Sequence, residues 1–142
     1  MIDKMRAFLL SYPGWEEGKL LYIDDTDNAP GNGGLFPQGV QTVAIRQDIL
    51  GNCQQDYRAT FTLYRASAET EADAPWLLNF QSWIARQSAL GLAPKFGDVP
   101  QTERLRAEKG KLHSRQGAGG LYSVILTAEF TKLHEVNEIG EN

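Results

Sequence analysis

The sequence predicts an α+β fold in which a largely antiparallel sheet of four to five strands is covered on one face by one main helix and a short N-terminal helix. Two pairs of strand-like segments are joined by short turns, as is typical of β-hairpins. One long segment with helical periodicity lies between the two pairs. Antiparallel hairpins on either side of one large helix indicate a layer of helices packed on a sheet.

The length and composition indicate one globular domain spanning residues 1–142. A chain of 142 residues is long enough to bury about 70% of the surface that it exposes when unfolded. Hydrophobic residues make up 42% of the sequence and charged residues 23%, as in ordinary folded proteins. We expect fraying only in the last residues, 137–142.

Charge and cysteine content argue against several classes of protein. The net charge of −4 is unlike that of a dedicated nucleic-acid binder, whose affinity comes from neutralising phosphates. Cys53 is the only cysteine, which excludes an intrachain disulfide and a zinc site made by several cysteines of one chain. No apolar run is long enough to cross a membrane, so we expect a cytoplasmic protein without membrane contact.

The first elements are a short helix and a strand. A helix is expected over residues 2–12, because Ile2, Met5 and Leu9 recur at helical spacing. Residues 19–25 contain an unbroken apolar run that is too short for a helix. Such a run is typical of a strand covered on both faces.

Residues 24–41 are rich in glycine and are predicted to form a long loop. Long loops inside compact domains are uncommon and are often functional. This loop carries Leu35 and Phe36, which a solvated loop does not need. We expect both side chains to contact a neighbouring subunit, with packing onto the chain's own core as the alternative. Replacing both by serine is then expected to reduce assembly and leave the monomer folded.

A hairpin should follow the loop. Residues 41–50 are strand-like with an irregular pattern, and Gly51 with Asn52 supplies a turn. In residues 53–67 apolar and polar side chains alternate, which predicts one core face and one mostly polar face. Because the turn is so short, the two segments are expected to pair.

The main helix is predicted after a polar connection at residues 68–73. Leu77, Phe80 and Ile84 lie on one helical stripe. Glycine at position 91 is a typical helix stop. This helix should cover the core.

A second hairpin is predicted at the C-terminal end. In residues 102–115 the apolar side chains change from one parity to the other at Gly110, as a bulge or kink would require. Residues 117–120 form a glycine-rich turn. Residues 122–130 then alternate as a long final strand.

The strand at 102–115 should present a basic stripe on the face opposite its apolar residues. The stripe consists of Arg104, Arg106, Lys111, His113 and Arg115. Such a stripe suits phosphates or an acidic partner. An equally good interpretation is an exposed strand whose charges prevent aggregation, because the stripe lacks aromatic residues for base stacking.

A cluster of carboxylates at Asp24, Asp25 and Asp27 does not match a calcium loop. Counted from Asp25, Pro30 stands where that loop needs glycine, and Phe36 stands where it needs a bidentate glutamate. A solvated acidic loop is the better interpretation.

Other reactive groups are few and scattered. The glycines at 31–34 lack the spacing of a dinucleotide or phosphate loop. His113 and His134 lie on neighbouring predicted strands, but two histidines without a third ligand make a weak metal site. Cys53 is expected to be a buried or half-buried thiol. We therefore expect no catalytic residue, no bound cofactor and no metal, and a protein that is not an enzyme.

The order of several segments resembles the minor capsid or tail terminator proteins of long-tailed bacteriophages and prophages. These segments are residues 57–64, 76–84, 92–98, 106–112 and 121–124, with Lys132 beyond them. Together the resemblance covers about residues 57–132, and no single segment is distinctive alone.

The resemblance implies a virion structural protein without catalytic residues. Such a protein forms a ring, expected to be a hexamer, at the head-proximal end of the tail tube. It stops tube polymerisation and joins the tail to the neck of the filled head. The partners implied are further copies of the chain, the tail tube protein and a head completion or neck protein, and the basic stripe could contact DNA in the lumen.

Two other functions remain open at this stage. The chain could be a head completion or neck connector protein, because such proteins share its size, acidity and small α+β folds. It could also be a small nucleic-acid-binding or enzymatic accessory protein, in which case DNA retention should depend on salt and on the basic stripe.

Overall fold

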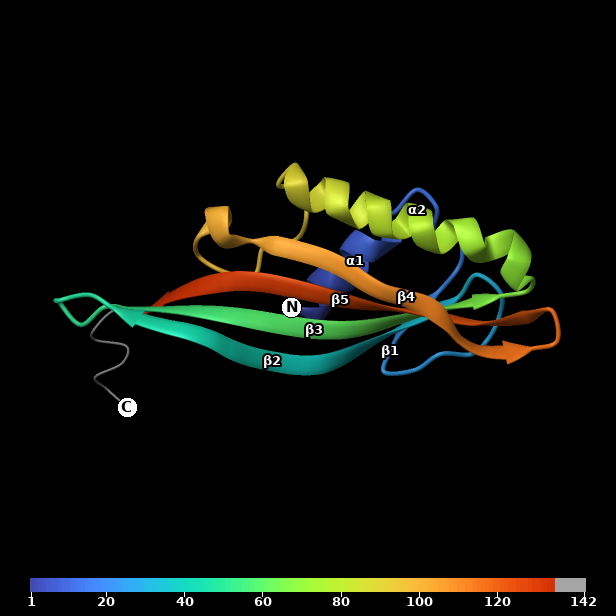
Figure 1. Cartoon of the computed structure of the whole chain (residues 1–142), viewed down its shortest axis with the longest axis horizontal. Coiled ribbons are helices and arrows are strands. Elements are labelled where there is room, and N and C mark those ends of the chain that lie inside the picture. The colour runs from blue at the N-terminus through green and yellow to red at the C-terminus, as the bar shows by residue number, and fades with distance from the viewer. Residues whose placement is uncertain (135–142) are drawn as a thin grey trace.

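A computed structural model describes residues 1–134 (Figure 1). The expected fraying at 137–142 lies outside the described residues. The elements, in chain order, are α1 (Ile2–Leu10), β1 (Leu21–Ile23), β2 (Gly33–Gln47), β3 (Cys53–Ser67), α2 (Thr70–Ala89), a 3₁₀ turn η1 (Pro100–Thr102), β4 (Arg104–Gln116) and β5 (Gly119–His134).

The strands form one five-stranded sheet in the order β1-β2-β3-β5-β4. Both expected hairpins are present, because β2 pairs with β3 and β4 pairs with β5 in antiparallel register. Gly51 adopts a positive φ of 86° in the turn between β2 and β3, which glycine does without strain. β1 pairs only with β2 and runs parallel to it. The predicted α+β fold with a largely antiparallel sheet is confirmed.

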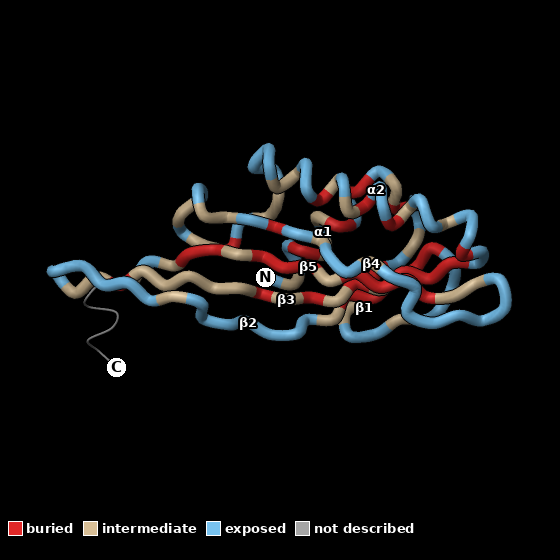
Figure 2. Tube along the Cα trace, in the orientation of Figure 1, coloured by how far each residue is buried: buried red, intermediate tan, exposed pale blue. Residues whose placement is uncertain are grey.

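Both helices lie on one face of the sheet, and no helix of residues 1–134 covers the other face (Figure 1). The buried residues form one core cluster to which both helices and the strands contribute, and Figure 2 marks them along these elements. Leu77, Phe80 and Ile84 of α2 are buried there, as their spacing predicted. Phe8 of α1 stacks on Trp83 of α2, with ring centroids 4.8 Å apart, so the two helices also pack against each other.

The helix α2 begins earlier than the sequence analysis expected. It starts at Thr70 and includes most of the predicted polar connection. Glu71 and Asp73 lie in its first turn, where the helix dipole stabilises acidic side chains. Asp73 also accepts a hydrogen bond of 2.6 Å from the Ser67 hydroxyl, which fixes the junction between β3 and the helix.

The prediction of a loop over residues 24–41 is wrong for residues 33–41, because β2 starts at Gly33. The glycines that suggested a loop are required by close packing. A Cβ at Gly33 would lie 2.4 Å from the Tyr64 carbonyl oxygen and 2.6 Å from the Trp15 ring. A Cβ at Gly34 would lie 2.1 Å from the Asp25 carbonyl oxygen. Only residues 24–32 connect β1 to β2.

The predicted irregularity at Gly110 is confirmed. The register between β4 and β5 shifts between Glu108 and Lys111, and again between Leu112 and Ser114. A Cβ at Gly110 would lie 2.8 Å from a methyl carbon of Leu77, so the bulge also makes room for α2. None of the helices in residues 1–134 is long and apolar enough to cross a membrane.

Candidate functional site

Leu35 and Phe36, the expected subunit contacts, lie on opposite faces of β2. Leu35 is fully buried in the core beneath the helices, so its assignment to an interface is wrong. The physical reason is the strand itself, because successive side chains of a strand point to opposite faces. Phe36 lies on the face without helices, where its ring meets Tyr64 edge-on at 5.3 Å. It is half-buried, and its role in a contact stays a prediction.

A group of exposed apolar side chains lies on β2 and on the turn between β2 and β3. We call it the hairpin surface, and it was missed from the sequence. Its members and their exposed fractions are Val40 54%, Val43 50%, Ile45 61%, Ile49 103% and Leu50 73%. Exposed apolar side chains gathered on one hairpin are typical of sites that bind another protein.

The fold explains why the hairpin surface is exposed. β2 is 15 residues long, but β1 pairs only with Gly33–Leu35, so no strand within residues 1–134 pairs with the outer edge of the rest of β2. The hairpin also projects past the ends of both helices, at the left of Figure 1. At its tip the Asp48 carboxylate accepts hydrogen bonds from the backbone N–H groups of Leu50 and Asn52. This ordered turn holds Ile49 and Leu50 in solvent.

All five residues of the basic stripe are exposed. Arg106 forms ion pairs with Glu108 at 2.7 Å and with Glu129 at 2.9 Å, so its charge is largely neutralised. The Arg104 guanidinium donates to the carbonyl oxygens of Gln101 and Glu103.

The basic stripe was expected on one continuous face of its strand, and this prediction is wrong. Lys111 pairs in register with Ser123, on the face without helices, and the His113 ring contacts Tyr64 at 5.0 Å on that same face. Arg115 pairs with Gly120, in the row of side chains that belongs to the helix-covered face. The second register shift in β4 causes this change of side.

The acidic loop forms the opposite edge of the sheet, beyond β1. The Asp27 carboxylate accepts hydrogen bonds from the Tyr22 hydroxyl, the Ala29 N–H and the Asn32 amide. The backbone hydrogen bond from Ala29 and the side-chain bond from Tyr22 lower the pKa of Asp27 below its ordinary value. The same bond to Asp27 raises the pKa of Tyr22. Asp27 is therefore held as an anion at neutral pH.

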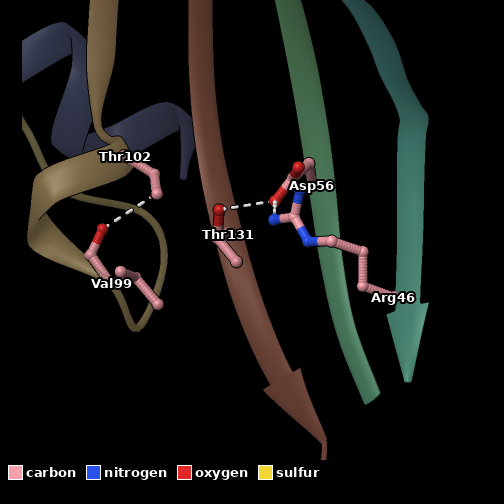
Figure 3. Close-up of polar contacts among 5 residues, drawn as sticks. All are labelled: Arg46, Asp56, Val99, Thr102 and Thr131. Carbon is pink, nitrogen blue, oxygen red and sulfur yellow. Dashed lines mark hydrogen bonds and ion pairs between the residues drawn. The ribbon is translucent and has the colours of Figure 1, made fainter. Parts of the chain in front are cut away.

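A shallow cavity of about 260 Å³ lies near the base of the hairpin. Its polar centre is Asp56, which accepts a hydrogen bond of 2.8 Å from the Thr131 hydroxyl and pairs with Arg46 at 2.9 Å (Figure 3). On the other side, Thr102 donates to the Val99 carbonyl oxygen within the turn η1 (Figure 3). The Asp56 contacts cross-link β2, β3 and β5, so this carboxylate has a structural role.

The remaining candidate reactive groups are not collected in one place. Cys53 is buried and lies opposite His134 in the register of β3 and β5. His113 contacts Tyr64, near the other end of the same sheet, so the structure does not bring the two histidines together. Within residues 1–134 no group of three or more His, Cys, Asp and Glu side chains is arranged to hold a metal ion.

No model of a known protein family matches this sequence, and no curated protein matches it.

Proposed function

We propose that this chain is a structural subunit that acts by assembling with copies of itself. The hairpin surface is the observation that supports this most directly. Fully burying one large aliphatic side chain contributes about 1.5 to 3 kcal/mol, and five such side chains lie exposed on one element. A contact with another protein chain would remove them from water.

Within this class, we propose a tail terminator of a long-tailed phage or prophage, located in the virion at the head-proximal end of the tail. The resemblance over residues 57–132 supports this, because all of its segments except 92–98 fall in regular elements. Residues 57–64 lie in β3, residues 76–84 in α2, and residues 106–112 at the bulged part of β4.

The proposed partners are further copies of the chain in a ring, expected to be hexameric, together with the tail tube protein and a head completion or neck protein. A head-to-tail ring needs two different surfaces on each copy. The hairpin surface projects from one end of the sheet (Figure 1), so it can reach beyond its own subunit. The pairing of Arg106 with two glutamates weakens the case for a dedicated DNA-binding stripe.

The decisive experiment is assembly of tail tubes with and without this protein, observed by negative-stain electron microscopy. A terminator is expected to give tubes of limited length with a ring at one end, and its absence is expected to give overlong tubes. A neck connector would leave tube length unchanged and bind the head instead. Tubes of equal length in both conditions, without bound protein, would reject the proposal.

A pair of variants tests the part played by the hairpin surface. Ile49→Ser/Leu50→Ser should reduce ring occupancy of tube ends at least tenfold, because two apolar side chains no longer gain from burial. The matched control is Leu90→Ser/Leu92→Ser, since both leucines are 63% exposed but lie after α2. Equal loss in both variants would show that general apolar content, and not the hairpin, drives assembly.

A further inference from the structure

The two edges of the sheet carry opposite charges. Asp24, Asp25 and Asp27 follow β1 at one edge, and we call them the acidic edge. The basic stripe of β4 lies at the other edge.

Charges from both edges lie on the same face of the sheet. The acidic edge folds toward the face without helices, because the Asp25 backbone covers Gly34 there. The Tyr22 side chain, which binds Asp27, points to that face too. Most of the basic stripe shares this face, since His113 contacts Tyr64 on it.

The two edges also lie at the same level along the strands. The register runs from Tyr22 to Gly34, from Gly34 to Tyr64, from Tyr64 to Ser123, and from Ser123 to Lys111. The hydroxyl that holds Asp27 and the ammonium group of Lys111 therefore belong to one row across the sheet.

Few of these charged side chains form ion pairs within the monomer. Within residues 1–134, Arg106 is the only member of the basic stripe that pairs with a carboxylate, and the acidic edge pairs with no lysine or arginine. The hydrogen bonds that Asp27 accepts come from neutral groups. Both edges thus present net charge to solvent.

Strand direction suits contact between unlike edges. β1 runs parallel to β2, and three antiparallel pairings follow across the sheet, so β4 runs opposite to β1. Copies that follow one another in the same orientation therefore bring β4 of one copy antiparallel to β1 of the next. A two-fold contact between like edges would instead oppose like charges, which is destabilising.

We propose that the acidic edge of one copy contacts the basic stripe of the next copy, so that the ring grows head to tail through unlike edges. This inference depends on the proposed function, because it names the contact that closes the ring. Heterologous contacts of this kind form rings when the rotation between copies closes.

Charge reversal tests the junction. Variant A is Asp24→Lys/Asp25→Lys, which makes the acidic edge basic. Variant B is Arg104→Glu/Lys111→Glu, which makes the open face of the β4 edge acidic, because Arg106 is already paired with two glutamates there and Arg115 lies on the other face. Asp27 is left unchanged because it holds the loop through its hydrogen bonds. Each variant alone should assemble at least tenfold less than the wild type, by sedimentation velocity and by ring occupancy of tube ends. Urea unfolding checks that both variants fold.

Mixing the two variants gives the sharpest outcome. In an alternating ring each acidic edge of B faces a basic edge of A, so an equimolar mixture should recover most of the wild-type assembly. Controls with the same change in net charge are Glu69→Lys/Glu71→Lys and Arg86→Glu/Lys95→Glu, all at exposed positions in α2 or in the segments that flank it, outside β4 and the acidic edge. These controls should assemble like the wild type.

Several results would overturn the junction. One is normal assembly of variant A alone and of variant B alone, and another is a mixture of the two that does not assemble. A third is reduced assembly of variant B only, together with weaker DNA retention, which would assign the basic stripe to DNA binding. If variants A and B bind tube ends normally, the proposed junction is rejected while the proposed terminator function stands. If the protein forms charge-dependent rings that never bind tube ends, the proposed junction stands while the proposed terminator function is rejected.

Discussion

Leu35 and Phe36 show how one residue decides between core and surface. They are adjacent in sequence, but Leu35 lies under the helices and Phe36 lies on the open face. The glycines before them suggested a loop because glycine is common in loops. Here Gly33 and Gly34 are small because a backbone carbonyl oxygen lies against each of them. Sequence alone does not separate these two uses of glycine.

We predict that Leu35→Ala lowers the free energy of unfolding by about 2 to 5 kcal/mol, since it leaves a cavity in a packed core. Phe36→Ala should cost less, because this half-buried ring loses mainly its contact with Tyr64. Urea denaturation of both variants gives the comparison. If Leu35→Ala leaves stability unchanged and weakens assembly, the interface assigned from sequence was right after all.

Asp27 should make stability depend on pH. Its pKa is lowered in the folded state, so the folded protein binds this proton less readily than the unfolded chain does. The resulting stabilisation is complete above the unfolded pKa of about 3.9 and is lost as pH falls through the lower folded value. Asp27→Asn should therefore make the loss of unfolding free energy below about pH 4 shallower.

Urea unfolding measured between pH 5 and pH 2 tests this expectation. Asp24→Asn is the matched control, because it removes a carboxylate from the same loop without touching the hydrogen bonds of Asp27. Identical pH slopes for the two variants would contradict the role given to Asp27.

At the scale of elements, the sequence was most informative where periodicity is strong. The alternation in β3 and β5 and the stripe on α2 predicted those elements and their buried faces. The parallel pairing of β1 with β2 could not be predicted. It joins only three residues of each strand, Leu21–Ile23 and Gly33–Leu35, and neither segment has an alternating pattern. The exposed hairpin was missed for a related reason. Its apolar residues Val40, Val43 and Ile45 look like core residues until the sheet shows that no element covers them.

The bulge in β4 is predicted to be coupled to α2. Gly110→Ala should lower the free energy of unfolding by about 1 to 3 kcal/mol, because the added methyl group meets Leu77 at 2.8 Å. In a Leu77→Ala background the same change should cost less, since of the two opposing side chains, Leu77 and Gln81, only Gln81 remains. A double-mutant cycle measured by urea denaturation gives this coupling. Strictly additive effects would show that the bulge and the helix pack independently.

For the whole molecule, two surfaces of different chemistry serve the same proposed assembly. The carboxylates Asp24, Asp25 and Asp27 and the basic stripe were both visible in the sequence. Their placement on opposite edges was not, because it depends on the strand order β1-β2-β3-β5-β4. The hairpin surface adds an apolar contact at one end of the same sheet.

The two contacts should respond differently to salt. Raising NaCl from about 0.1 M to about 1 M shortens the screening length from about 10 Å to about 3 Å, so a charged junction weakens. Apolar burial is not screened, and sulfate strengthens it. At equal ionic strength, wild-type assembly should therefore be weakened less by sodium sulfate than by NaCl.

The hairpin variant Ile49→Ser/Leu50→Ser should keep the weakening by NaCl but show a smaller difference between the two salts, because it removes the two most exposed of the five apolar side chains on which sulfate can act. Sedimentation velocity across both salt series measures this. If NaCl leaves wild-type assembly unchanged, the charged edges contribute little to the ring. If the two salts act equally on the wild type, the hairpin surface is not buried on assembly.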